Sequence, residues 1–172
     1  MGLVEILEEY AKGRRDFTGI DLSETSLVGV NLSGVILDHA DLNGANLSRA
    51  DLSNARLNHA DLNGANLTHT NLQGADLQDA ILDGAILQGA VLDNANLSHS
   101  EMTVANMTEA HLSEANLSEA NLYAANLEQA DLTGADLTVA DLSQTNLQSA
   151  DLNQANLNGT NLEGANTENT VL

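Results

Sequence analysis

Histidine and carboxylate side chains recur at intervals of 20 residues in the first part of the chain. His39, His59 and Asp79 belong to one such series, and His99 follows at the next interval. Imidazole and carboxylate groups suit zinc or nickel, so these residues are candidate ligands if the chain stacks them in a column. A metal site needs three or four ligands that converge on one point, whereas a parallel ladder splays its side chains apart. We therefore expect neither a metal site nor any other cofactor.

Other catalytic chemistry finds little support in the sequence. The chain has no cysteine to act as a nucleophile, and its five histidines all fall at outward positions of a repeat. Serines are plentiful, but no spacing links them to His and Asp as a triad, and no glycine-rich loop is placed to cradle a phosphate. The sequence predicts a protein that is not an enzyme.

Charge excludes further classes of function. The 172 residues contain 5 Lys+Arg and 25 Asp+Glu, a formal net charge of -20. Proteins that grip nucleic acid or anionic membranes carry an excess of basic residues, so neither is an expected partner. All five basic residues lie within the first 56 positions, while residues 57–172 carry 16 acids and no base.

The elements that must position these side chains follow from a repeat of five residues that runs unbroken from Phe17 to Leu172. Of its 32 central positions, 28 are Leu; a small residue stands two places earlier, and Asp or Asn usually stands one place earlier. A step of five spreads Leu around a helix and sends it to alternate faces of a strand, so neither element can use this period. A chain that turns one corner per repeat keeps every Leu inside. The repeat therefore predicts a solenoid.

The unit A(D/N)LxG or A(D/N)Lxx resembles the pentapeptide-repeat family, over residues 15–172 or about 92% of the chain. The resemblance implies an all-β fold, a right-handed quadrilateral β-helix with 20 residues per coil. About eight coils would form a rod roughly 38 Å long. We expect a single repeat domain, residues 15–172, whose core includes Phe17, Leu22, Leu42, Leu62, Leu82, Met102, Met107 and Leu122.

A short helix is expected to cap the first coil, within residues 1–14. Its apolar residues recur at helical spacing, and Gly13 is a plausible helix stop; the stripe comprises Leu3, Ile6, Leu7 and Tyr10. No matching cap is visible at the other end of the repeat. We expect the last coil to present unpaired backbone and to support an end-to-end homodimer.

Coils of 20 residues sort the side chains onto four faces, and one of these faces is strongly acidic. This Leu22 face is built on Leu22, Leu42, Leu62, Leu82, Met102, Leu122, Leu142 and Leu162. It has no Lys or Arg, and its acids are Asp21, Glu24, Asp41, Asp61, Asp83, Glu101, Asp141 and Glu163. Ile81, Val104 and Tyr123 occupy outward positions on three successive coils of the same face. We hypothesise that a partner binds at these acidic and apolar residues.

Two functions remain open. In the first, the acidic solenoid is a structural scaffold or protein-interaction surface, and the charge also maintains solubility. In the second, it imitates DNA, because the resemblance implies that some family members bind type II topoisomerases such as gyrase in this way. Residues 57–172 span roughly 28 Å, over which a duplex carries about 16 charges, and the segment holds 16 acids. A DNA-binding protein would then be the partner.

The chain start also bears on location. MGLVEILEEY carries three glutamates where a secretory signal needs a basic start, and no stretch of 18 apolar residues follows. We expect a cytoplasmic protein without membrane contact.

Overall fold

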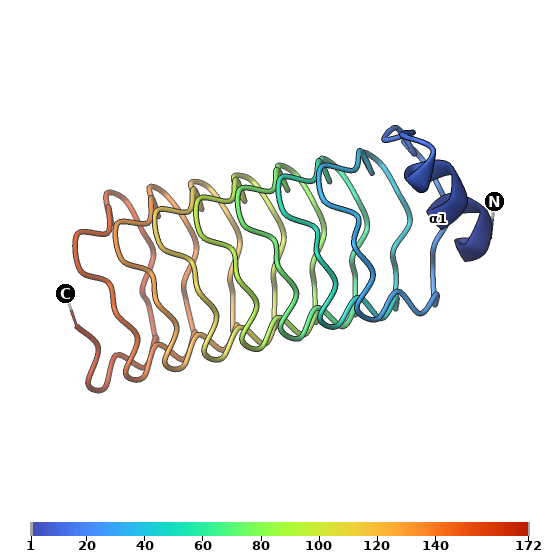
Figure 1. The fold of residues 1–172 in the computed structure, drawn as a ribbon. Helices are drawn as coiled ribbons and strands as arrows, with labels where there is room; N and C mark the ends of the chain where they lie inside the picture. Colours follow the sequence, from blue (N-terminus) through green and yellow to red (C-terminus); the bar gives the residue numbers. More distant parts are fainter. Residues whose placement is uncertain (1, 172) are drawn as a thin grey trace.

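The computed structural model describes residues 2–171, and its helix lies at one end of a stack of coils (Figure 1). This helix, α1, spans Leu3–Ala11. It is shorter than the predicted cap of residues 1–14, because the chain leaves the helix through Gly13, whose φ of +100° favours glycine.

The predicted apolar stripe of α1 packs on the first coil. Ile6 is buried, and its neighbours on the stripe are partly buried against the core: Leu3, Leu7 and Tyr10. The Tyr10 hydroxyl also donates a hydrogen bond to the Ser33 carbonyl (2.7 Å), which ties the helix to a residue 23 positions away. The helix therefore closes the apolar core at this end.

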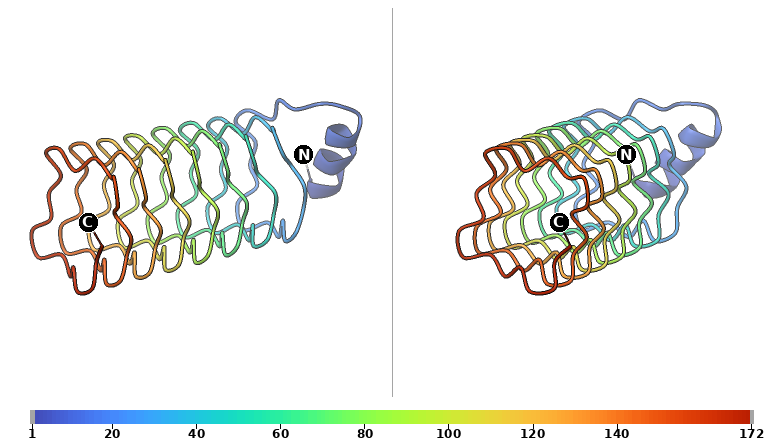
Figure 2. Two further views of the ribbon diagram at one scale, coloured as in Figure 1. Left: turned by 60° about the vertical axis from the view of Figure 1, so that its left-hand side comes forward. Right: turned by 90° about the vertical axis from the view of Figure 1, so that its left-hand side faces the viewer.

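The coils repeat every 20 residues, and four pentads complete each one. One residue per pentad forms a parallel bridge with the residue 20 positions later, as in Asp21 with Asp41 and Asp41 with Asp61. Successive coils therefore stack in register (Figure 2). The β-solenoid is confirmed, but the expectation of an all-β chain needs correction: the described repeats contain isolated bridges in place of continuous strands, because each pentad turns after a single paired residue. The right-handed sense remains a prediction.

Backbone hydrogen bonds connect each pentad to the coils on both sides. Leu42 N–H donates to the Asp61 carbonyl (2.7 Å), and Gly44 N–H donates to the Asn63 carbonyl (2.9 Å). In the reverse direction, Asp61 N–H donates to the Ala40 carbonyl (2.9 Å). Because this pattern recurs in successive coils, most backbone donors are satisfied without extended strands.

Leucine and alanine fill the interior. Apolar atoms of both residue types are removed from water along the whole axis, which supplies the main driving force for folding. Eight core residues were expected from the sequence, and all are at most 2% exposed: Phe17, Leu22, Leu42, Leu62, Leu82, Met102, Met107 and Leu122.

Every pentad ends in a turn whose third residue has a positive φ, which is the signature of a type II turn. Glycine fills some of these positions, but twenty non-glycine residues adopt the same conformation. They include Val104 (φ 53°) and Val139 (φ 60°), whose β-branched side chains disfavour it. The regular stack therefore imposes one turn geometry whatever the local residue prefers.

The coil farthest from α1 is less covered than the others. Leu152 is 3% exposed and Leu162 is 36% exposed, and Leu157 is partly buried. Figure 1 shows this coil at the end opposite α1, with no helix over it.

Candidate protein-interaction surface

The acids that precede the core leucines form part of the turns. Asp41 Oδ1 accepts a hydrogen bond from Asn43 N–H, and Asp61 Oδ1 accepts one from Asn63 N–H, both at 3.0 Å. Asparagine does the same, as Asn46 does with the N–H of Ser48 (3.1 Å). These Asx turns explain why either Asp or Asn stands before Leu, a role that the spacing alone did not reveal.

Three pentads lack Asp or Asn at this position, and each takes its acceptor from the coil before. Where Arg56, Glu101 and His111 stand, the donors are the backbone N–H groups of Asn58, Thr103 and Ser113. The acceptors are Asp38 (3.2 Å), Asp83 (2.8 Å) and Asp93 (3.0 Å). These are the only aspartates that directly follow a core leucine. The turn donor is thus capped across coils when its own pentad cannot cap it.

The Leu22 face combines these structural roles with a dense negative charge. Asp21, Asp41 and Asp61 follow one another directly in the bridge register, with no cationic side chain between them. The Ser23 hydroxyl, followed by its backbone N–H, lowers the pKa of Asp21. The Ser143 hydroxyl and backbone N–H likewise lower the pKa of Asp141. Hydrogen bonding therefore favours the ionised form of both carboxyls, although like charges lie nearby.

The remaining predicted acids of this face are engaged in different ways. Asp83 is partly buried over the Thr103 N–H, so it has a structural role in addition to its charge. Glu101 is exposed and accepts a hydrogen bond from Asn121 Nδ2 (2.7 Å). Glu163 is exposed in the last coil.

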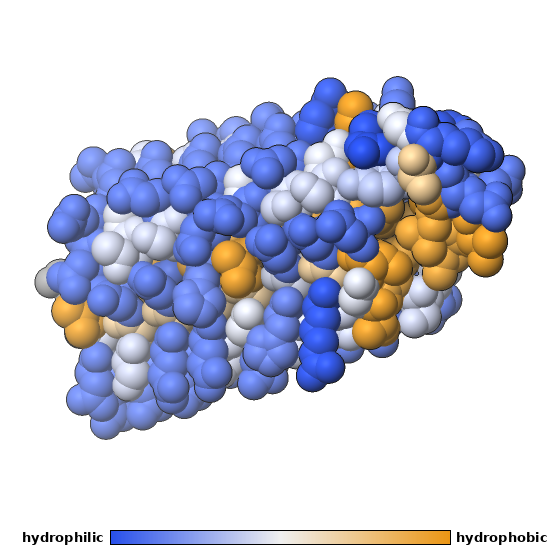
Figure 3. Space-filling view, viewed as in Figure 1, coloured by the Kyte–Doolittle hydropathy of each residue, from blue (hydrophilic) through white to orange (hydrophobic). Residues whose placement is uncertain are grey.

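The three apolar residues predicted on the Leu22 face are all exposed: Ile81 by 39%, Val104 by 58% and Tyr123 by 45%. Val104 N–H donates to the Tyr123 carbonyl (3.0 Å), so these two residues lie on adjacent coils. Gly84 and Ala124 flank Val104 along the same corner, so they shield its methyl groups little. On the side drawn in Figure 3, hydrophobic residues form small separate spots among hydrophilic ones, with a larger group near α1.

The histidine column is brought together as the spacing predicted, in a line. The rings of His39 and His59 are stacked, with centroids 4.9 Å apart and planes inclined by 6°. His59 Nε2 lies 3.9 Å from an Asp79 carboxylate oxygen, and His99 Nδ1 lies 3.5 Å from a Glu119 carboxylate oxygen. Glu119 was missed by the sequence analysis, although its spacing of 20 from His99 identifies it.

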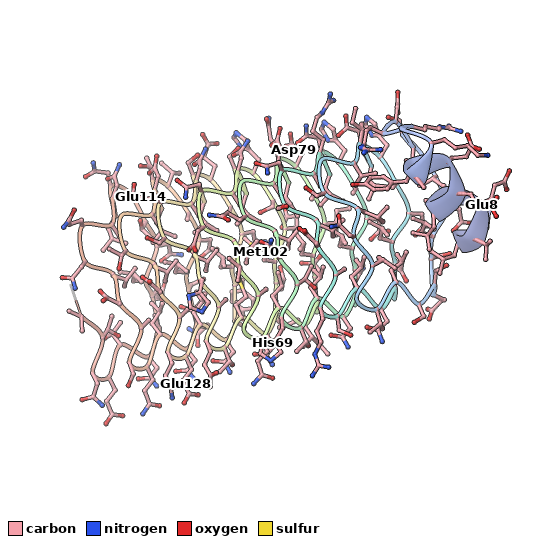
Figure 4. The ribbon with its side chains drawn as sticks, in the orientation of Figure 1. Glu8, His69, Asp79, Met102, Glu114 and Glu128 are labelled. Atoms are coloured by element: carbon pink, nitrogen blue, oxygen red, sulfur yellow. The ribbon has the colours of Figure 1, made fainter. Side chains whose placement is uncertain are left out.

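This column does not form a metal centre. Within residues 2–171, no group of three or more His, Asp or Glu side chains is arranged to hold a metal ion. Its members project from the turns at a corner of the coils, as Asp79 does along one long edge in Figure 4, with His69 and Glu128 along the opposite edge. The described part of the chain also has no detected pocket, and none of its helices is long and apolar enough to cross a membrane.

Comparison with known proteins assigns the chain to a family. The model of pentapeptide repeats matches with eight copies, over residues 16–54, 45–84, 70–108, 100–138 and 135–172. The chain belongs to the pentapeptide-repeat family. A comparison with curated proteins found no significant match.

Two solved pentapeptide-repeat structures are similar to this member. HetL, from the cyanobacterium Nostoc sp. strain PCC 7120 and involved in regulating heterocyst differentiation, is 34% identical, with a TM-score of 0.57. The alignment covers 100% of this chain and 95% of HetL. QnrB1, a plasmid-mediated fluoroquinolone resistance protein, is 22% identical, with a TM-score of 0.56 over 88% of this chain and 86% of its own. At that identity, QnrB1 supports the fold alone.

Proposed function

We propose that this protein is a non-catalytic β-solenoid that binds a partner protein through its Leu22 face. The observation that carries the proposal is the composition of that face: eight acids, no Lys or Arg, and three exposed apolar residues within three coils. Complementary charge steers association, and apolar groups near the centre of an interface contribute affinity once water is excluded. The regulatory role of HetL is consistent with a repeat protein that acts by binding.

The backbone contacts support a rigid recognition surface. Turn N–H groups hold the carboxylates of Asp41 and Asp61, and inter-coil hydrogen bonds hold the turns. Side chains fixed before binding lose less conformational entropy when a partner docks. The acids are therefore presented as an ordered array.

A second candidate is DNA mimicry directed at a type II topoisomerase. Its support is the charge of residues 57–172, with 16 acids and no base at about the linear density of a duplex. These acids are spread over all four faces, and only five lie on the Leu22 face. A gyrase supercoiling assay discriminates: inhibition or protection by micromolar protein favours mimicry, whereas no effect favours the scaffold.

The direct test compares two variants of equal charge. Asn retains the Oδ1 acceptor that caps the turns, so Asp→Asn substitution removes charge while it preserves the fold. The Leu22-face variant replaces Asp41, Asp61, Asp83 and Asp141. Its control lies on the opposite Leu32 face, built on residues 32, 52, 72, 92, 112, 132 and 152, and replaces Asp51, Asp93, Asp131 and Asp151.

The two sets match in structural role as well as in charge. Each has three Asx-turn aspartates and one that caps the next coil, Asp83 (2.8 Å) or Asp93 (3.0 Å). We expect the Leu22-face variant to lose partners captured from host extract and the control to retain them. Equal capture by both variants would refute the assignment of the site.

We also propose end-to-end association through the coil of residues 152–171. It is supported by the exposure of Leu162 and by backbone N–H groups, such as those of Leu157 and Leu162, that donate to no described backbone acceptor. Sedimentation that remains monomeric at high concentration would refute it. Cytoplasmic location, and a single domain at residues 15–172 behind a cap at residues 1–14, complete the proposal.

A further inference from the structure

Three Asn-Gly pairs occupy the same two turn positions of their pentads: Asn43-Gly44, Asn63-Gly64 and Asn158-Gly159. Their glycines have similar φ angles of 63°, 63° and 72°. In each turn the Asn N–H donates to the Oδ1 atom two residues earlier, at 3.0, 3.0 and 3.2 Å respectively. Local sequence and turn geometry are therefore nearly the same at the three sites.

The sites differ at the glycine N–H. Gly44 N–H donates to the Asn63 carbonyl and Gly64 N–H donates to the Asp83 carbonyl, both at 2.9 Å. Gly159 N–H has no backbone acceptor within the described residues. Exposure does not explain the difference, because both residues of the Asn63 and Asn158 pairs are exposed.

This contrast matters because that nitrogen is the nucleophile in asparagine deamidation. The glycine N–H loses its proton to hydroxide or a buffer base, and the nitrogen attacks Cγ of the preceding Asn. A C–N bond forms, the bond to the side-chain amide nitrogen breaks, and ammonia leaves with a proton from the solvent. Water then opens the resulting succinimide to aspartate or isoaspartate, with no change in oxidation state. A hydrogen bond that holds the N–H against a carbonyl opposes both deprotonation and attack.

We propose that Asn158 is a site of spontaneous deamidation in the folded protein, whereas Asn43 and Asn63 are protected by the inter-coil hydrogen bonds of their glycines. Reaction at the protected sites requires local opening of the coil. One backbone hydrogen bond corresponds to a rate difference of up to roughly tenfold, and the coupled bonds of an inner coil increase it. Modification of Asn158 adds one negative charge beside Leu157.

The test is peptide mapping by mass spectrometry after incubation of the full chain in mildly alkaline buffer. We expect deamidated Asn158 to accumulate at least about tenfold faster than deamidated Asn43 or Asn63. In concentrated guanidinium chloride all three sites should react at similar rates, because each has the same Asn-Gly sequence. An Asn158→Gln variant should lose the fast site and leave the slow sites unchanged.

Two results would overturn the proposal. One is native deamidation of Asn63 as rapid as that of Asn158, since only the glycine hydrogen bond separates these two exposed sites. The other is a preference for Asn158 that persists in denaturant, which would assign the difference to neighbouring sequence. Native Asn158 that is as inert as Asn63 contradicts it as well.

Discussion

Removal of the Asp83 carboxylate should destabilise the protein only while residue 101 cannot cap its own turn. Asp83 Oδ1 lies 2.8 Å from Thr103 N, and both residues are partly buried. Loss of a comparable capping acceptor costs about 1 kcal/mol. Asp83→Ala should therefore lower the free energy of unfolding by about 1 kcal/mol. With a urea m-value of about 2 kcal/mol/M, the unfolding midpoint falls by about 0.5 M.

Glu101→Asn supplies the missing acceptor from within the same pentad, as Asn106 does for Thr108 N–H (3.2 Å) in the next one. In the Glu101→Asn background, Asp83→Ala should cost close to nothing, which gives a coupling energy of about 1 kcal/mol. Gln88→Ala is the control, because Gln88 occupies the same turn position before the capped pentad of Thr108. Urea unfolding of the four cycle members measures the coupling. An equal cost of Asp83→Ala in both backgrounds would refute the capping rule.

The remaining predictions concern turns, pH and the cap. Val104→Gly should raise the free energy of unfolding by about 0.5–1 kcal/mol and Gly84→Ala should lower it by about 1–2 kcal/mol, because both change the side chain at a left-handed turn position; opposite signs in urea unfolding would contradict this. The Thr138 hydroxyl lowers the pKa of Asp136, so this carboxyl stabilises the fold above its unfolded pKa of about 3.9 and less as the pH falls below it. The stability difference between wild type and Thr138→Val should accordingly shrink below about pH 4, and a constant difference would count against the contact. Tyr10→Phe removes the hydrogen bond to Ser33 and should speed amide exchange in the first coil by a few-fold, with the last coil as the internal control.

The sequence predicted the repeat, its inside and its period because these depend on the spacing of Leu and Ala alone. The same spacing placed His39 above His59 and located the exposed Ile81. Family resemblance supplied the number of residues per coil, which the parallel bridges confirm.

Other features depend on contacts between coils that a single pentad does not encode. The Asp38, Asp83 and Asp93 caps were not predicted, because each carboxylate serves a turn 20 residues later. The all-β expectation was wrong in detail because a pentad that turns at every unit leaves one residue to pair. Positive φ at Val104 and Val139 was equally hidden, since the stack overrides local preference.

Site-directed photocrosslinking tests the proposed interaction surface most directly. A photoreactive amino acid at Tyr123 would lie on the Leu22 face, and the same substitution at Thr133 would occupy the equivalent turn position on the opposite face. We predict that a host protein crosslinks at position 123 and that the Leu22-face charge variant abolishes this product. Crosslinking at position 133 in place of 123, or a product at 123 that survives charge removal, would contradict the account.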